Sequence, residues 1–268
     1  MAALTRLISA EIMKAVRLKL PWMGLAFSGL MAFVARHTVE RMAAPGELST
    51  RVYLTADLNL LSTSIIPIFS TVFAATLIAS ETSRGTLRML LPRPIWRSTL
   101  LHAKLATGLG YLALMFVVNL AVALPLALSY PLRNTFDEGL PLPGPAGQIG
   151  ILAIVLGLTY LPHAATVCFA FLVSIISRSV ATAIGVAVGV VLCLYPIQIV
   201  HIGSVNIGDF MFSSYYDDAI GIGDNIAGGF AESWNQESIR MLVLTSVVSA
   251  AVFLVCGYLV FTRRDLKD

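Results

Sequence analysis

Few side chains in this sequence could do chemistry, and most of them are isolated from one another. The cysteines Cys168, Cys193 and Cys256 stand far apart in apolar stretches, where a thiol packs as a small apolar group and no metal-ligand spacing arises. His163 follows a proline, a position in which a histidine typically bonds a backbone carbonyl that the proline frees. The chain has no G-x-x-x-x-G-K-[ST] phosphate loop and no calcium-loop spacing. We therefore expect no catalytic residue, no metal site and no enzyme activity.

One segment concentrates charge in a different way. It runs from Glu81 to Lys104, reads ETSRGTLRMLLPRPIWRSTLLHAK, and holds five of the eighteen basic residues, two prolines and a tryptophan. Its first half places Leu87, Leu90 and Leu91 on one helical face and arginines on another. The prolines break this helix, and a second helix follows them. Such a hairpin can lie on a membrane with its arginines on anionic head groups, or it can contact another protein.

Composition assigns the chain to the membrane proteins. The 268 residues are 57% hydrophobic and 12% charged, with a mean hydropathy of +0.83, whereas about a quarter of a soluble domain is charged. The apolar residues cluster in runs near the roughly 20 residues that cross about 30 Å of hydrocarbon as a helix. Helices are expected because every backbone amide in lipid must be hydrogen-bonded within its own segment. We predict an all-α integral membrane protein.

The predicted architecture is a single transmembrane domain over residues 1–268 with six transmembrane helices. The spans are expected at residues 20–35, 58–79, 105–128, 149–176, 180–200 and 241–261. A charged amphipathic elbow helix at residues 1–19 precedes the first span. A solvated or interfacial outer loop at residues 203–238 precedes the last span. Residues 81–104 lie between the second and third spans.

Basic residues set the expected orientation, because cytoplasmic loops carry an excess of lysine and arginine. With six spans both termini share a side, and thirteen of the eighteen basic residues fall on that side. Both termini and residues 81–104 are therefore expected in the cytoplasm. No Asp, Glu, Lys or Arg lies within a predicted span, so the residues that usually mark ion-coupled transport are missing.

Two helix faces could have roles beyond spanning the membrane. Ala181, Gly185 and Gly189 recur every four residues in the fifth span, and such small side chains let helices approach closely within lipid. This ridge could pack inside the chain or form a subunit interface. In the second span Ser64 and Thr71 are seven residues apart on a predicted common face. They could line a polar path, or they could bond back to their own helix.

The order of residues between Glu81 and Lys104 is more specific than the composition. It reads E-x-x-x-G-T-L-x-x-L-L-x-x-P-[IV]-x-R-x-x-x-x-x-x-K, which resembles the signature after the second span of the type-2 ATP-binding-cassette (ABC) permease family. The closing FTRRDL at residues 261–266 also resembles the usual end of that family's sixth span. The six helices, the cytoplasmic termini and the elbow helix match the same family. The chain departs from the pattern in one place, since PRP at residues 92–94 has one proline more than the signature needs.

The resemblance implies a membrane subunit that works as a pair of copies, usually a homodimer, on two separate cytoplasmic ATPase subunits. ATP and magnesium would be bound by those partners and no cofactor by this chain. The implied coupling element is a cytoplasmic helix within residues 81–104. By resemblance, the coupling residues are Glu81, Arg84, Gly85, Thr86, Leu87, Leu90, Leu91, Pro94, Arg97 and Lys104.

Each group of these residues has an implied role. Glu81 and Arg84 would fix the end of the second span against the coupling turn, and Gly85 would allow a close approach or a bend. The leucines would fill an apolar contact with the ATPase, and Arg97 and Lys104 would pair with acids or helix ends. In this family the second and fifth spans face the partner copy. The candidates for the dimer interface or pathway are Ser64, Thr71, Ala181, Gly185 and Gly189.

The implied location is the bacterial or archaeal cytoplasmic membrane, with membrane lipid as a further partner and no nucleic acid. Polysaccharide exporters of the family usually lack the E-x-x-x-G-T-L element, so export of a drug, antimicrobial compound, lipid or small peptide is favoured. An accessory role in maturing an extracytoplasmic metalloenzyme is also open. Two other classes stay open, an ion-coupled secondary carrier and a membrane binding or immunity protein without transport. The lack of intramembrane acids and of inverted-repeat symmetry argues against the carrier.

Overall fold

The computed structural model describes residues 2–43, 48–85, 97–132, 143–198, 200–202, 205–227 and 237–263, which are almost entirely helical. The helices are α1 (Ala2–Val16), α2 (Lys19–Met42), α3 (Thr50–Leu60), α4 (Ile66–Ser83), α6 (Arg97–Ala127), α7 (Pro145–Ile176), α8 (Val180–Ile197), α9 (Asp218–Ala227) and α10 (Glu237–Arg263). The shorter elements are a π-helical turn at Leu61–Ile65, 3-10 turns at Ile207–Phe210 and Phe212–Tyr215, and the paired strands β1 (His201–Ile202) and β2 (Val205–Asn206).

Helices able to cross a membrane make up most of the bundle. Among the described residues five are long and apolar enough, at Thr50–Ser83, Ser98–Ala127, Pro145–Ile176, Val180–Ile197 and Glu237–Arg263. A sixth is added if α1 and α2 count as one span, although this pair is bent by 77°. The predicted all-helical, multi-pass class is confirmed at this level.

The first long helix, α2, extends beyond the predicted end of its span. The sequence predicts an end at residue 35, but α2 continues to Met42. Its last turns are polar and carry an ion pair between Arg36 and Glu40, four residues apart, at 2.9 Å. Such ion pairs stabilise a helix outside the hydrocarbon, so α2 continues beyond its apolar residues.

The second span begins earlier than residue 58, where the sequence predicts its start. The helix begins at Thr50, and the side chain of Ser49 caps it by accepting a hydrogen bond from the backbone of Val52. Within this span Pro67 lacks a backbone N–H, and its ring would clash with the carbonyl four residues earlier in a regular helix. The π-helical turn at Leu61–Ile65 lies just before this proline and takes up one extra residue. The faces of α3 and α4 are therefore out of register.

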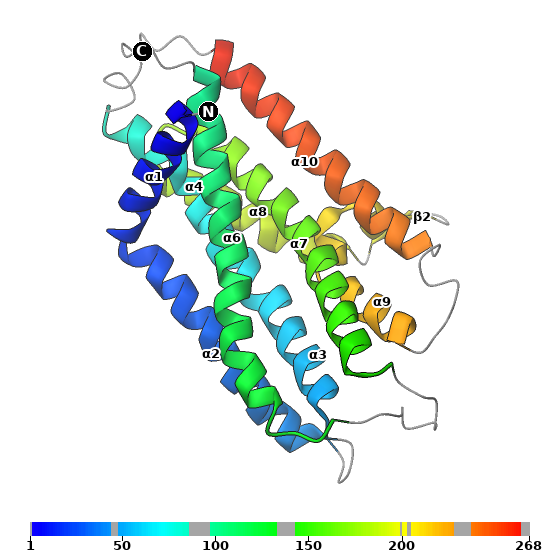
Figure 1. The fold of residues 1–268 in the computed structure, drawn as a ribbon. Coiled ribbons are helices and arrows are strands. Elements are labelled where there is room, and N and C mark those ends of the chain that lie inside the picture. The colour runs from blue at the N-terminus through cyan, green and yellow to red at the C-terminus, as the bar shows by residue number, and fades with distance from the viewer. Residues whose placement is uncertain are drawn as a thin grey trace.

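Helix α4 occupies the centre of the bundle, surrounded by α2, α6, α7 and α8 (Figure 1). Its buried side chains include Phe73 and Ile78, which belong to one core cluster with Met115 of α6 and Phe171 of α7. Lipid tails are as apolar as these side chains, so close packing and polar contacts hold the helices together more than hydrophobic burial does.

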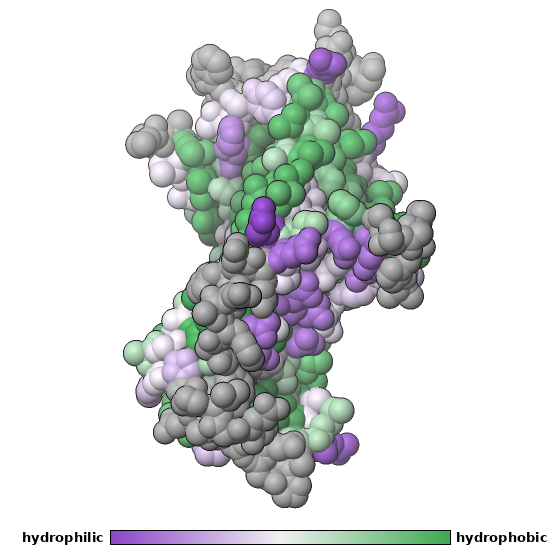
Figure 2. Space-filling view, turned by 90° about the vertical axis from the view of Figure 1, so that its right-hand side faces the viewer, coloured by the Kyte–Doolittle hydropathy of each residue, from purple (hydrophilic) through white to green (hydrophobic). Residues whose placement is uncertain are grey.

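Helix α10 lies on the outside of the bundle and presents large apolar side chains. They include Val248, Val252, Val255 and Leu259, which are all at least 45% exposed. Figure 2 shows apolar side chains over the upper part of this face, where α10 runs in Figure 1, and a band of hydrophilic side chains below them. Such a surface is typical of a helix that faces lipid.

The segment between α8 and α10 packs into the bundle, so its described part is not a fully solvated loop. Tyr216 is 1% exposed, and Tyr215 and Ile222 are also buried. Helix α9 and the turn before it pack against α7 and α10. In the sequence YYDDAIGIGDN the acids suggest solvent, but the aromatic and aliphatic residues between them supply a buried face.

Candidate functional site

The predicted coupling segment begins and ends at a cluster of four charged side chains. Lys104 of α6 is 1% exposed, and its Nζ donates to the backbone oxygen of Leu77 at 2.8 Å and to Glu11 Oε2 at 2.9 Å. The same Nζ lies 2.9 Å from Glu81 Oε1 at the end of α4. Lys14 Nζ completes the group, 2.6 Å from Glu11 Oε1 and 2.9 Å from Glu81 Oε1. We call Glu11, Lys14, Glu81 and Lys104 the ionic cluster.

The ionic cluster has no net charge, because two lysines face two glutamates. Burial alone would raise the pKa of the Glu11 carboxyl, but Lys104 and Lys14 outweigh it and hold that pKa below its ordinary value. Burial would lower the pKa of Lys14, but its bonds to Glu11 and Glu81 raise it above the ordinary value. Both residues lie on α1, which precedes the first long helix. Each keeps its charge because its partners replace the lost water.

Helix α1 brings Glu11 and Lys14 to this position. The two residues are three apart on one helical face, and α1 packs against α6. The break after Val16 turns the chain by 77° into α2, and Trp22 Nε1 donates to the Val16 oxygen at 2.8 Å across the bend. The resemblance implies that Lys104 pairs with acids or helix ends, and the structure places it against Glu11 and Glu81. The sequence analysis misses Glu11 and Lys14, whose only sequence signal is an acid and a base three residues apart in an amphipathic segment.

Gly85 forms the bend that the sequence predicts at the start of the coupling turn. Its φ is +68°, the only positive φ among the described residues, and its N–H donates to the Thr82 oxygen at 3.1 Å. It follows Arg84, the exposed C-cap of α4, so it ends the helix in the left-handed conformation that glycine favours. No atom of the described residues lies within 4 Å of a Cβ placed there, so the positive φ is the feature of this position that favours glycine.

The rest of the predicted coupling element lies outside the described residues. Residues 86–96 include Thr86, Leu87, Leu90, Leu91 and Pro94. Arg97 is the first residue of α6.

The small residues of α8 face outward, so the reading in which they pack inside the chain is wrong. Ala181 and Gly185 are exposed and Gly189 is half-buried. A Cβ added at either glycine would meet no atom within 4 Å. The bundle instead receives the neighbouring face of α8, which carries Ala183 and Ala187, both fully buried.

The predicted common face of Ser64 and Thr71 does not form. Ser64 is exposed, whereas Thr71 is fully buried. The π-helical turn at Leu61–Ile65 causes this difference, because its extra residue rotates the two positions apart. Tyr195 of α8 donates its hydroxyl to the Thr63 oxygen in this turn at 2.6 Å.

Asp57 is a buried acid that the sequence analysis places outside the second span. It is 1% exposed, and its Oδ1 accepts from Asn119 Nδ2 at 3.2 Å, while the same amide also donates to the Ser28 oxygen at 3.1 Å. Asp57 precedes Glu81 by about 36 Å of helix at 1.5 Å per residue. That distance exceeds the roughly 30 Å of hydrocarbon. The two acids are therefore further apart along the helix than a hydrocarbon layer is thick, and Asp57 joins α2, α3 and α6 through these hydrogen bonds.

A second buried polar group surrounds His163. Ser62 Oγ lies 2.5 Å from the Tyr216 backbone oxygen and 2.7 Å from His163 Nε2. The hydroxyl proton must point to the carbonyl, so His163 donates to Ser62. Since the serine proton is not held by the histidine, the pair is not an activated nucleophile. The expected bond of His163 to a freed carbonyl is replaced by this one, and its ring stacks on Tyr216 with centroids 4.4 Å apart.

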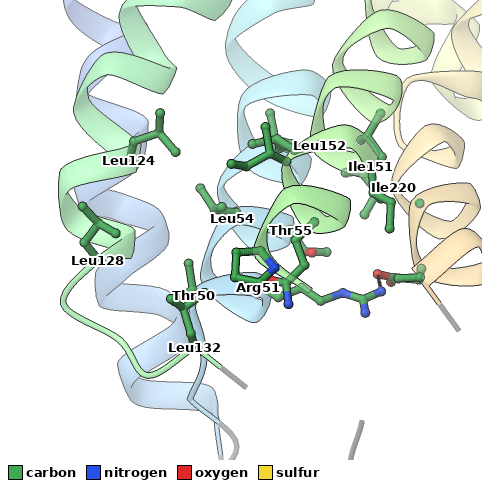
Figure 3. A pocket seen from close by; sticks show the side chains of 18 residues that line it. Thr50, Arg51, Leu54, Thr55, Leu124, Leu128, Leu132, Ile151, Leu152 and Ile220 are labelled. Atoms are coloured by element: carbon green, nitrogen blue, oxygen red, sulfur yellow. Dashed lines mark hydrogen bonds and ion pairs between the residues drawn. The ribbon is translucent and has the colours of Figure 1, made fainter. Parts of the chain in front are cut away.

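A cavity of about 310 Å³ lies at the end of the bundle opposite the ionic cluster, which we call the far end. Figure 3 shows the side chains that line it. The cavity is lined by residues of α3, α6, α7 and α9, and half of its lining residues are leucine or isoleucine. Arg51 of α3 and Asp224 of α9 form an ion pair beside it.

The fold and these clusters define an all-helical protein with several helices able to cross a membrane and a buried ionic cluster at one end. The chain belongs to the family described as "Protein of unknown function (DUF2705)", which it matches over residues 29–267. Comparison with curated proteins finds no match.

Proposed function

We propose that this chain is the membrane subunit of an ABC transporter, an exporter that works as a pair of copies on two cytoplasmic ATPase subunits. The proposal rests on the resemblance between residues 81–104 and the signature of the type-2 permeases. The observation that supports it best is the ionic cluster at both ends of that segment. ATP and magnesium would bind to the partner ATPase.

The ionic cluster supports coupling because it joins three helices at one point. Glu81 ends α4 and Lys104 lies in the first turns of α6, so the segment between them leaves and re-enters the bundle at the same group of charges. Glu11 ties α1 to that point. Breaking a buried ion pair by removing one partner costs about 3–5 kcal/mol. A displacement of the segment would therefore move α1, α4 and α6 together rather than separate them.

The exposed small residues of α8 support a pair of copies. Gly185 and Gly189 present backbone without side chains on the outer surface. A second copy could approach this surface more closely than lipid-facing valine or leucine would allow. In the proposed transporter this face, with the neighbouring exposed part of α4, contacts the partner copy.

Figure 1 places α1 and the C-terminal end of α10 at the same end of the bundle. This arrangement supports termini on one side of the membrane, which we propose to be the cytoplasm of a bacterium or archaeon. The coupling segment starts and ends at that same end, as contact with a cytoplasmic ATPase requires.

Asp57 favours a second candidate, an ion-coupled carrier, because buried acids often bind the coupling ion or proton. Its bond to Asn119 agrees equally with a structural role. The two candidates differ in their energy source. A carrier would need an ion gradient and no ATPase, whereas the ABC subunit would need ATP.

The test is co-purification from native membranes. Tagged full-length chain, extracted in mild detergent, should retain an ATPase with a phosphate-loop motif in a one-to-one ratio. Leu87→Asp, within the predicted apolar contact, should abolish this retention while Val248→Asp on the outer face of α10 should spare it if the protein still inserts. A chain that purifies alone, yet transports in response to an ion gradient, would replace the proposed function by the carrier.

A further inference from the structure

The cavity at the far end has the size and lining of a ligand site. Its volume of about 310 Å³ falls at the lower end of the roughly 300–1,000 Å³ of small-molecule pockets. In Figure 3 Leu124 of α6 and Leu128, which directly follows α6, stand across the space from Leu152 of α7, with Leu54 of α3 between them. The lining residues that the structure describes include aliphatic side chains and no aromatic ring, and such walls suit a flexible hydrocarbon chain.

Counting along α6 places the cavity at a membrane boundary. The charges of the ionic cluster mark one limit of the hydrocarbon, because buried charge deep in lipid is costly. About 20 helical residues cross the hydrocarbon, so the opposite limit falls near Leu124. Leu128 and Leu132 lie beyond it, at the level of the lipid head groups. The mouth of the cavity is therefore within reach of lipids in the adjacent leaflet.

Several side chains beside the cavity are left uncovered at this level. Leu128 is 75% exposed, Ile149 is 68% exposed and Leu132 is 56% exposed. Leu128 and Leu132 follow the end of α6, and Ile149 lies in the first turns of α7, so these residues form one edge of the opening. Grouped apolar surface outside the hydrocarbon is a mark of a binding site.

The polar side of the mouth is formed by Arg51 and Asp224. The Arg51 side chain extends from α3 toward α9 in Figure 3 and pairs there with the Asp224 carboxylate. A guanidinium binds phosphate oxygens through several N–H groups in one plane. The site thus combines an aliphatic interior with the Arg51–Asp224 ion pair at its edge.

We propose that this cavity binds one acyl chain of a phospholipid from the adjacent leaflet, with the lipid phosphate beside Arg51. The proposal does not depend on an ATPase partner, because its observations lie at the opposite end of the bundle from the coupling segment.

The experiment uses the full-length chain in nanodiscs that contain a trace of phospholipid with a photoreactive diazirine in its acyl chain. After illumination, peptides cross-linked to lipid are quantified by mass spectrometry. Labelling should be enriched on the cavity-facing residues of α3, α6 and α7 relative to α10, whose outer face samples ordinary surrounding lipid. Equal labelling on α10 and on the cavity helices would overturn the proposal.

Cavity-filling variants test whether the chain enters the space. Leu54→Trp should lower cavity labelling relative to α10 by about tenfold, since excluding even two methylene groups forfeits binding of that order. Val248→Trp, a matched change on the outer face of α10, should leave the ratio unchanged. Ile151→Phe serves as a second filling variant if Leu54→Trp does not elute as a monodisperse protein. Unchanged cavity labelling in a folded filling variant would contradict the proposal.

Competition distinguishes the phospholipid from other chains. Unlabelled phospholipid should displace the probe better than a free fatty acid of equal length, and Arg51→Gln should reduce that preference. Stronger displacement by the fatty acid, or an unaltered preference in Arg51→Gln, would overturn the assigned phosphate contact.

Discussion

Lys104→Met removes the buried cation of the ionic cluster while it keeps an unbranched side chain of similar length. Glu11 and Glu81 then face each other with only Lys14 between them, and the cluster carries a net negative charge. Because Lys104 is 1% exposed, water cannot replace it, and the expected loss of stability is about 3–5 kcal/mol. For a chain of this size that loss corresponds to a melting temperature lower by roughly 10 °C.

Lys14→Met is the matched control for this change. Lys14 touches the same two carboxylates, but its side chain is 53% exposed, so water compensates for most of its loss. We expect a cost of about 0–1 kcal/mol and a shift of a few degrees at most. Thermal unfolding of both variants in the same detergent, followed by tryptophan fluorescence, measures the difference.

A double variant tests whether the effect comes from charge balance. Glu81→Gln combined with Lys104→Met leaves one glutamate and one lysine in the ionic cluster. The double variant should therefore melt at a higher temperature than Lys104→Met alone. Residues in one ionic network are expected to be non-additive in this way. Equal shifts from Lys14→Met and Lys104→Met, or a double variant with the summed loss, would refute the view that a buried, balanced cluster holds these helices together.

Three further outcomes are expected. Gly189→Leu should weaken association of two copies, because the added side-chain carbons separate backbones that need close contact. Disulfide cross-linking between two Gly185→Cys copies, with and without Gly189→Leu, measures this association. A protein that stays monomeric under all conditions would exclude the interface. Asp57→Asn should keep the melting temperature within a few degrees and should spare ATP-driven export. Asp57→Leu should cost about 1–3 kcal/mol, because one of the two N–H groups of the Asn119 amide loses its buried acceptor while the bond to the Ser28 oxygen stays. Loss of transport in a stable Asp57→Asn protein would favour the ion-coupled carrier. Because the pKa of Glu11 is lowered in the folded protein, its contribution to the free energy of unfolding is full above the ordinary carboxyl pKa and is lost as pH falls through the folded-state pKa. Because the pKa of Lys14 is raised, its contribution is lost as pH rises through the folded-state pKa of Lys14. Unfolding measured from acid to alkaline pH should therefore show a maximum of stability between these limits, and a Glu11→Gln protein should lose the acid-side decline.

The sequence predicts the membrane class and the cores of the long helices, because hydropathy reports the stretch of chain that hydrocarbon can accept. It does not report where a helix ends. The polar turns from Thr50 to Asp57 stay helical through Ser49 capping and through burial of Asp57 against Asn119. Hydropathy detects neither contact, because the Ser49 cap is a polar hydrogen bond and Asn119 lies far from Asp57 in the chain.

The predicted register of the second span is wrong for another reason. Pro67 is visible in the sequence, but the π-helical turn that accommodates it depends on how the surrounding helices pack. Counting seven residues from Ser64 to Thr71 assumes a regular helix, so one additional residue in the turn invalidates the shared face.

The candidate site is only partly predictable. Glu81, Gly85 and Lys104 are singled out by the order of residues in one segment, and the structure shows a positive φ at Gly85 and an ion pair between Lys104 and Glu81. Glu11 is 93 residues from Lys104, and no local pattern connects the two. The burial of Tyr216 also depends on distant helices, which explains why an acidic, glycine-rich segment reads as a solvated loop.

The most direct measurement of the central claim is ATP hydrolysis by the chain reconstituted with its co-purifying ATPase. If residues 81–104 couple the two proteins, Leu87→Asp and Gly85→Val should both abolish stimulated hydrolysis while expression and membrane insertion stay intact. The first buries a carboxylate in a predicted apolar contact, and the second puts a branched side chain at a φ of +68°. Arg93→Gln should have a mild effect, because position matters more than charge in a protein contact. Equal and small effects from all three substitutions would mean that the segment only binds lipid head groups, and would contradict the proposed transporter.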